Sequence, residues 1–296
     1  MSLRTSKIFG SRGPSQTEEP NKKFIFLFEG EKTEKQYFEG LFNSREEFGI
    51  QELLDIKTLE REDGSRSNQK KIVEELHNSI QAVIELKGNK EQFLLEVEKI
   101  FEKLGIPNYD GIKARIGHVL SGSNIEENLD ELIQDIAIMK IESKELEDFI
   151  NQLSDLRDLL EFEKEYDTVC IILDRDKHSF KEWQYDEVLE ICSQNNYTLG
   201  ITNPCFEFWL LLHLSDCTEH NIESIKENKR INKSRKYVEG LLLEEIGSYK
   251  KNKLKFNIFK PGIRDAIRRE KEFCEDVTRL KDEVGSNIGV IISELL

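Results

Sequence analysis

Three carboxylates follow two apolar runs of the kind that form buried strands. Glu29 directly follows residues 24–28, and Asp174 and Asp176 follow residues 168–173. Ligands of open α/β sheets bind beyond the carboxyl ends of the strands, and side chains two residues apart on a strand point the same way. If the two strands are neighbours, the three acids converge. Such oxygen ligands suit a hard divalent cation, with Glu29 as a ligand or as a general acid or base.

The segments around these runs predict a parallel α/β sheet. Both runs are rich in β-branched or aromatic residues, as strands buried on both faces are. A helix is expected from Thr33, the N-cap of a capping box with Gln36, to about residue 43. A strand over 53–59 and a helix over about 67–86 follow. This alternation predicts a parallel sheet flanked by helices.

The alternation stops between residues 89 and 162 and then resumes. In that stretch leucine and isoleucine recur at three- and four-residue spacing among acids, which predicts an inserted α-helical subdomain. Its helices either pack on one another or offer a surface to a partner. Beyond it we expect strands near 169–173 and 197–202, a helix over about 181–194, and a buried helix over 205–214 with Pro204 at its first position.

These elements predict three parts. Residues 1–21, with their Ser, Gly, Pro and mixed charges, read as a flexible N-terminal tail. Residues 22–88 and 163–296 form the α/β core with a helical C-terminal extension, and residues 89–162 form the insertion.

The formal charge of −15 is unevenly distributed. Residues 226–271 hold 15 Lys and Arg against 6 Asp and Glu, a local balance of +9, so the rest of the chain carries −24. Such a stretch is either a phosphate-binding face or a solvated helical surface. On the first interpretation the candidate nucleic-acid-binding residues are Lys250, Lys251, Lys253, Lys255, Arg264 and Arg268.

Composition also bears on location. No apolar stretch approaches the roughly 20 residues needed to span a bilayer, so no membrane association is expected. The five cysteines are scattered and contain no C-x-x-C pair, and Cys170, Cys192 and Cys205 sit in apolar runs typical of a core. This use of cysteine favours a reducing, cytoplasmic setting.

The order strand-Glu-Gly, helix, strand, helix, strand-Asp-x-Asp resembles the Toprim domain. More specifically, the motifs beginning at Glu29 (EGEKTEKQYF), Leu173 (LDRDKH) and Asn203 (NPCFEFWLLLH) resemble the RloB family, Toprim-like proteins tied to phage defence that include the AbiL abortive-infection systems. The resemblance implies chemistry on nucleic-acid phosphodiesters that depends on Mg²⁺ (or Mn²⁺), often nuclease activity beside an ATPase partner protein. It also implies that Glu29 is the Toprim glutamate and that Asp174 and Asp176 bind the metal.

Other residues near these motifs have two interpretations each. Thr33 and Glu34 follow Glu29 closely and are candidates for contact with the substrate. For Thr33 the alternative is that it only caps a helix. His178 either assists proton transfer or is a loop histidine. Glu207 either supports the metal site or is an anion favoured by the first turn of its helix. His213 is interpreted as a core histidine.

The leading hypothesis is a metal-dependent nuclease that acts in antiviral defence on DNA or RNA, tRNA included. A first rival is a non-catalytic regulatory or effector subunit of an ATPase-containing complex, and a second is chemistry on a phosphorylated small molecule. No Walker motif is present, so this chain is not expected to hydrolyse ATP. Assembly into a homo-oligomer is left open.

Overall fold

The chain divides into two compact units, and the larger one carries every described candidate residue. The computed structural model describes residues 3–5, 23–28, 33–50, 53–59, 69–87, 95, 97–99, 129–134, 147–150, 153 and 166–296. The larger unit comprises Ser6–Leu59, Ser65–Glu74 and Tyr166–Leu296, and the other comprises Met1–Thr5, Glu60–Gly64 and Glu75–Glu165.

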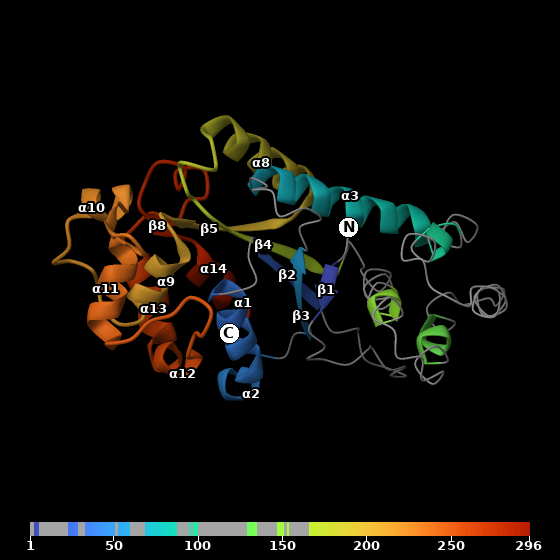
Figure 1. The fold of residues 1–296 in the computed structure, drawn as a ribbon, viewed down its shortest axis with the longest axis horizontal. Coiled ribbons are helices and arrows are strands. Elements are labelled where there is room, and N and C mark those ends of the chain that lie inside the picture. The colour runs from blue at the N-terminus through green and yellow to red at the C-terminus, as the bar shows by residue number, and fades with distance from the viewer. Residues whose placement is uncertain are drawn as a thin grey trace. The chain divides into compact units, whose positions relative to one another are not determined.

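A mostly parallel sheet forms the centre of the larger unit (Figure 1). Its strands are β2 (Lys23–Phe28), β3 (Leu53–Leu59), β4 (Thr168–Asp174), β5 (Thr198–Asn203) and β8 (Gly285–Ser286), in the order β3-β2-β4-β5-β8. The pairs β2–β3, β2–β4 and β4–β5 are parallel, and β5–β8 is antiparallel. The strand that precedes Glu29 and the strand that ends at Asp174 are therefore parallel neighbours, as the sequence analysis supposed.

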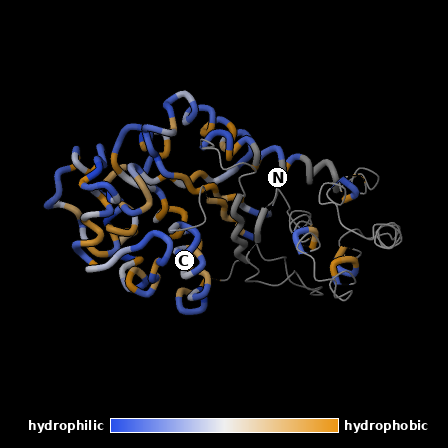
Figure 2. The backbone as a smooth tube through the Cα atoms, viewed as in Figure 1, coloured by the Kyte–Doolittle hydropathy of each residue, from blue (hydrophilic) through white to orange (hydrophobic). Residues whose placement is uncertain are grey.

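The two central strands are buried on both faces, which explains their apolar sequences. Every residue from Phe24 to Phe28 and from Val169 to Leu173 is buried. Phe24, Phe26 and Phe28 share one core with side chains of α1 (Thr33–Asn43), α9 (Phe206–Leu212) and α14 (Ile288–Ser293). Helix α8 (Glu182–Asn195) lies on the other side of the sheet (Figures 1 and 2). Covering helices on both faces are what an all-apolar parallel strand requires.

The predicted helices over 67–86 and 181–194 are confirmed as α3 (Gln69–Lys87) and α8. A short helix α2 (Arg45–Phe48) follows α1. The C-terminal region is largely helical, as expected, and its last segment is a helix, α14. Its other elements are α10 (Ile222–Glu227), α11 (Tyr237–Ile246), α12 (Phe256–Phe259), a 3₁₀ turn (Lys260–Gly262) and α13 (Ile263–Glu270).

Two details of the predicted elements are wrong in this region. The chain between α10 and α11 forms an antiparallel hairpin of β6 (Arg230–Asn232) and β7 (Arg235–Lys236). Pro204 is not the first residue of α9, because Cys205 is extended, with φ −166° and ψ 164°, and serves as the N-cap. The peptide bond between Asn203 and Pro204 is cis. Helix α9 therefore begins at Phe206.

The remaining expectations concern the parts around this core. Within the predicted tail the structure describes one short strand, β1 (Leu3–Thr5), and the rest of 1–21 lies outside the described residues. Most of 89–162 also lies outside them, so the insertion stays a prediction. None of the described helices is long and apolar enough to cross a membrane. All five cysteines are described, and each is buried and free, which confirms that Cys170, Cys192 and Cys205 are core residues.

Candidate functional site

Asp174 ends the central strand β4 with its carboxylate held by the neighbouring strand and helix. Asp174 lies opposite Thr202 in the parallel β4–β5 register. The Thr202 hydroxyl donates to Asp174 Oδ1 at 2.8 Å, and the backbone N–H of Phe206 donates to the same oxygen at 2.7 Å. Two donors on one oxygen fix the orientation of the carboxylate at the carboxyl end of the sheet.

Asp176 follows two residues later and is half-buried. Its Oδ1 accepts the backbone N–H of His178 at 3.0 Å, and its Oδ2 pairs with Lys236 Nζ at 3.3 Å. Burial raises the pKa of Asp176, but the His178 hydrogen bond and the Lys236 charge outweigh burial and lower it overall. Asp176 is therefore ionised at neutral pH.

Arg175, between the two aspartates, belongs to a different environment. Its side chain is buried. Nε donates to the Lys281 carbonyl at 2.9 Å, and a guanidinium nitrogen donates to the Phe180 carbonyl. The guanidinium carbon lies 5.3 Å from the centre of the Tyr185 ring. Burial lowers the pKa of Arg175 from its ordinary value. These contacts join the loop after β4 to the C-terminal segment. Nothing in the D-x-D pattern signals this anchoring role.

Glu29 is the third predicted ligand, and it lies outside the described residues, as do residues 30–32. The described part of β2 ends at Phe28, which is paired in parallel with Ile172 of β4. Within the described part of the chain, no three His, Cys, Asp or Glu side chains are grouped so as to hold a metal ion. The meeting of Glu29 with Asp174 and Asp176 therefore stays a prediction.

Glu207 is buried in the first turn of α9. It directly follows Phe206, whose backbone N–H donates to Asp174. Lys251 Nζ pairs with Glu207 Oε1 at 2.9 Å, and the Tyr249 hydroxyl donates to the same oxygen at 2.9 Å. Burial raises the pKa of Glu207, but the Lys251 charge and these hydrogen bonds lower it overall. Lys251 also pairs with Glu239 of α11 at 2.7 Å. Glu207 thus has an explicit cationic partner in addition to the favourable end of its helix.

Thr33 and Gln36 do not form the predicted capping box. Thr33 is already helical, and its hydroxyl donates to the Lys251 carbonyl at 3.2 Å and lies 3.3 Å from the Tyr249 hydroxyl. The Gln36 side chain accepts the backbone N–H of Leu254 at 2.8 Å. Both side chains bind the segment 247–255 instead, because that segment brings donors and acceptors to the start of α1.

The remaining candidate residues, Glu34, His178 and His213, differ in how far they are buried. Glu34 lies in the first turn of α1 and is half-buried. His178 is exposed and contacts Asp176 through its backbone. His213 is buried and bonds the Tyr37 hydroxyl and the Trp209 carbonyl, both at 2.9 Å. Burial lowers the pKa of His213 to about 3, so the ring is neutral and the interpretation as a core histidine is confirmed.

Of the six predicted basic residues, two have an acidic partner among the described residues and four do not. Lys251 is tied to two carboxylates, and Arg268 pairs with Asp265 at 2.8 Å. Arg264 is exposed on α13. The other three are exposed and line a pocket: Lys250, Lys253 and Lys255.

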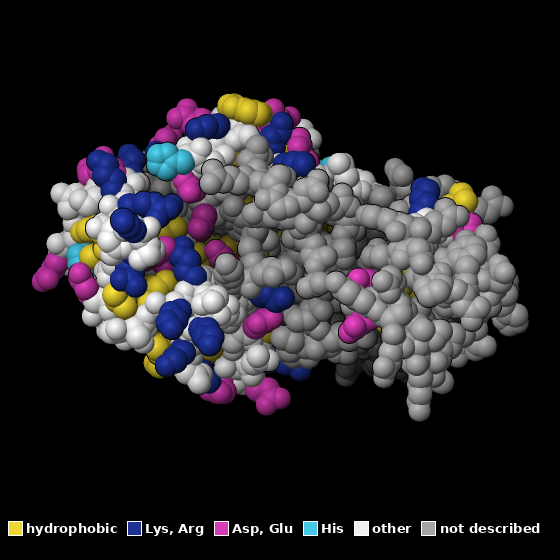
Figure 3. Space-filling view, viewed as in Figure 1, with side chains coloured by type: hydrophobic (Ala, Val, Ile, Leu, Met, Phe, Trp, Pro, Cys, Tyr) yellow, Lys and Arg dark blue, Asp and Glu magenta, His cyan; other side chains and the backbone are white. Residues whose placement is uncertain are grey.

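A further basic element was missed by the sequence prediction. Five Lys and Arg residues lie within 229–236, which spans the β6–β7 hairpin, and the last of them, Lys236, contacts Asp176. The only sequence signal was its place inside the basic stretch 226–271. Lysine and arginine side chains recur over the α10–α13 side of the larger unit in Figure 3.

The fold and the site define an α/β protein with a mostly parallel sheet and two acids, one at the end of a central strand and one just beyond it. The chain belongs to the RloB-like protein family, whose family model matches residues 24–295. Comparisons with curated proteins and with solved structures gave no match.

Proposed function

We propose that this chain is a Toprim-type nuclease of anti-phage defence that uses Mg²⁺ or Mn²⁺ to cleave nucleic-acid phosphodiester bonds. The catalytic carboxylates are Glu29, Asp174 and Asp176. The observation that carries the proposal is the parallel pairing of β2 with β4, because it gives the strand that precedes Glu29 and the strand that ends in Asp174 the same direction. Family membership supports the proposal, since the motifs lie inside the matched residues.

The donor set fits a hard cation. Carboxylate oxygens are what Mg²⁺ prefers, and it commonly takes one or two of them together with substrate phosphate. A bound divalent cation at such a site polarises the phosphodiester and lowers the pKa of water. Asp174 is oriented by Thr202 and Phe206, and Asp176 is kept ionised by His178 and Lys236. Glu29 then serves as a further ligand or moves the proton of the attacking water.

The basic hairpin favours a nucleic acid over a small phosphorylated substrate. Lys236 places an ammonium group 3.3 Å from Asp176, and four further cations precede it within 229–235. A basic hairpin whose last lysine contacts a candidate metal-binding residue matches a substrate whose phosphates continue beyond the bond that is cut.

The test is cleavage of labelled single- and double-stranded DNA and RNA by the full chain with Mn²⁺ or Mg²⁺. Asp174→Asn keeps the acceptor used by Thr202 and Phe206 and removes only the charge, so the fold is expected to survive. Asp174→Asn and Asp176→Asn should each lower the rate by at least about 100-fold, because even groups that only support metal ligands contribute roughly 10- to 100-fold.

Asp265→Asn is the matched control, since Asp265 is exposed on α13 and pairs only with Arg268 among the described contacts. It should cleave like the wild type. Wild-type rates in both site variants would refute the nuclease proposal, and tight binding of an ATPase without turnover would favour the regulatory role instead.

A further inference from the structure

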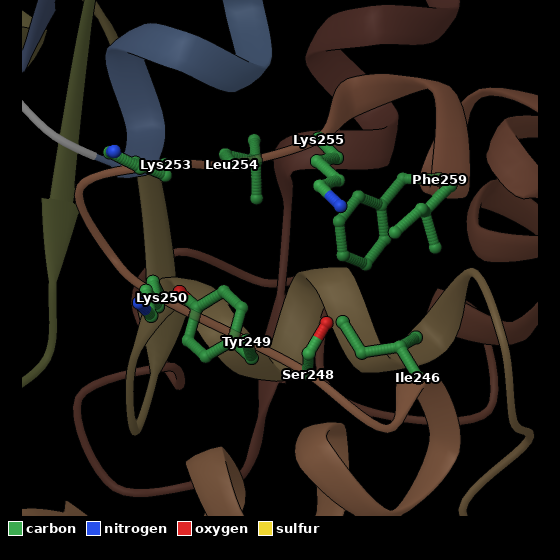
Figure 4. Close-up of a pocket in the computed structure, with 9 residues that line it drawn as sticks. Ile246, Ser248, Tyr249, Lys250, Lys253, Leu254, Lys255 and Phe259 are labelled. Carbon is green, nitrogen blue, oxygen red and sulfur yellow. The ribbon is translucent and has the colours of Figure 1, made fainter.

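A pocket of about 340 Å³ lies beside the segment 247–255 (Figure 4). Its lining comes from one stretch of chain, the end of α11, the following loop and α12. In Figure 4 the residues Lys253 to Lys255 run along one side of the pocket, and Ile246 to Lys250 run along the other. The wall is mixed, with apolar side chains such as Leu254 and Phe259, the ring of Tyr249, and three lysines.

The three lysines, Lys250, Lys253 and Lys255, are exposed, and no described carboxylate pairs with any of them. Other described lysines of this region, such as Lys251 and Lys260, do have acidic partners. Three lysines that lack a described acidic partner line one hollow, so its surroundings are positive and favour an anion. The apolar and aromatic wall favours a ligand that also carries a flat or apolar group.

The loop that carries these lysines is held in place at its centre and near its end. Lys251 pairs with Glu207 and Glu239, its carbonyl accepts from Thr33, and the Leu254 N–H donates to Gln36. The anchored Lys251 and Leu254 alternate with the three exposed lysines. The pocket is therefore preorganised, which lowers the entropic cost of binding.

The pocket is also connected to the candidate metal site. Tyr249 lines the pocket and donates its hydroxyl to Glu207, the residue after Phe206, whose N–H holds Asp174. A ligand in the pocket is thus bound by the same loop that fixes the start of α9. This continuity suits a nucleic-acid strand that occupies both places.

We infer that the pocket between Tyr249 and the three lysines binds a nucleotide unit, with its phosphate on the lysines and its base or sugar against the apolar wall. The inference rests on the proposed function in taking a nucleic-acid strand as the source of that unit. A free nucleotide offers the same chemistry, and the experiment separates the two sources.

The test measures binding of a short single-stranded oligonucleotide to the full chain by fluorescence anisotropy in EDTA, so that no divalent cation takes part. The variant Lys250→Gln/Lys253→Gln/Lys255→Gln should raise the dissociation constant about tenfold or more at low salt. It should also reduce the slope of log K against log salt by about 0.7, since each phosphate contact with a single strand contributes about that amount.

The control Lys71→Gln/Lys271→Gln/Arg279→Gln removes the same charge from exposed positions outside the pocket. It should change the affinity by no more than roughly twofold. Both variants are expected to melt like the wild type, which separates lost contacts from lost folding. An equal loss of affinity in the two variants, or no loss in the pocket variant, would overturn the inference.

A second arm identifies the source of the nucleotide unit by calorimetry with a mononucleotide 5′-phosphate and with the corresponding nucleoside. Binding of the mononucleotide alone, abolished in the pocket variant, supports a site for a free nucleotide unit. Binding of the oligonucleotide only, with the same dependence on the lysines, supports a strand. Because Asp174→Asn should bind normally in EDTA, failure of catalysis and failure of this pocket give different results.

Discussion

Asp176 shows how neighbouring groups can keep a half-buried carboxylate ionised. It is half-buried, which by itself favours the neutral carboxyl, yet a backbone N–H and the Lys236 ammonium keep it ionised. The folded-state pKa therefore lies below the ordinary value of 3.8. Ionised Asp176 stabilises the fold above that ordinary value, and this contribution is lost as the pH falls through the lowered pKa.

Replacing Lys236 by Gln should raise the pKa of Asp176, because burial still raises it and one of the two lowering influences is gone. The measurement is the pH titration of the Asp176 carboxyl carbon by NMR in the metal-free chain. Lys229→Gln is the matched control, since Lys229 pairs with Glu227 and not with Asp176. An unchanged titration in Lys236→Gln would show that the 3.3 Å contact has no electrostatic effect.

At the level of elements, the segment 247–255 joins helices that are far apart in the chain. Thr33 and Gln36 of α1, Glu207 of α9 and Glu239 of α11 all bind it through hydrogen bonds or ion pairs. The buried carboxylate of Glu207 is the centre of this arrangement. Its loss should affect the loop, the pocket and the start of α9 together.

Glu207→Gln should lower the free energy of unfolding by about 1–3 kcal/mol. The cost of breaking a wholly buried pair is about 3–5 kcal/mol. Here it is smaller, because Lys251 is half exposed and keeps Glu239, and because Gln still accepts from Tyr249. Urea denaturation measures the difference. The exposed Glu244→Gln on α11 is the control and should stay within about 0.5 kcal/mol of the wild type. Equal stability of Glu207→Gln would mean that the pair is dispensable.

The same elements show what local sequence could predict. The strands around Phe26 and Ile171 were recognisable because a central parallel strand is apolar on both faces, which leaves a signal in every residue. The β6–β7 hairpin left none, since its residues are polar apart from Ile231 and every residue of β6 is exposed. The start of α9 and the roles of Thr33 and Gln36 were misjudged because contacts with distant residues, not local propensity, decide them.

For the whole molecule, sequence predicted the positions of Asp174 and Asp176 in the fold better than those of the cations near them. A carboxylate directly after a buried strand is placed by the strand itself, so Asp174 and Asp176 could be identified from their positions. The position and partners of a lysine side chain depend on which distant residues the fold brings near it. The basic stretch therefore indicated a positive region, but it could not separate the anchored Lys251 from the exposed lysines of the pocket or identify Lys236 as the partner of Asp176.

Anomalous diffraction from crystals of the full chain grown with Mn²⁺ tests the central claim most directly. The account predicts Mn²⁺ coordinated by carboxylate oxygens of Glu29, Asp174 and Asp176, with the Lys236 ammonium displaced from Asp176. The Asp174→Asn variant should lose this anomalous peak under the same conditions. A wild-type structure at saturating Mn²⁺ in which these three carboxylates do not share a cation would contradict the account.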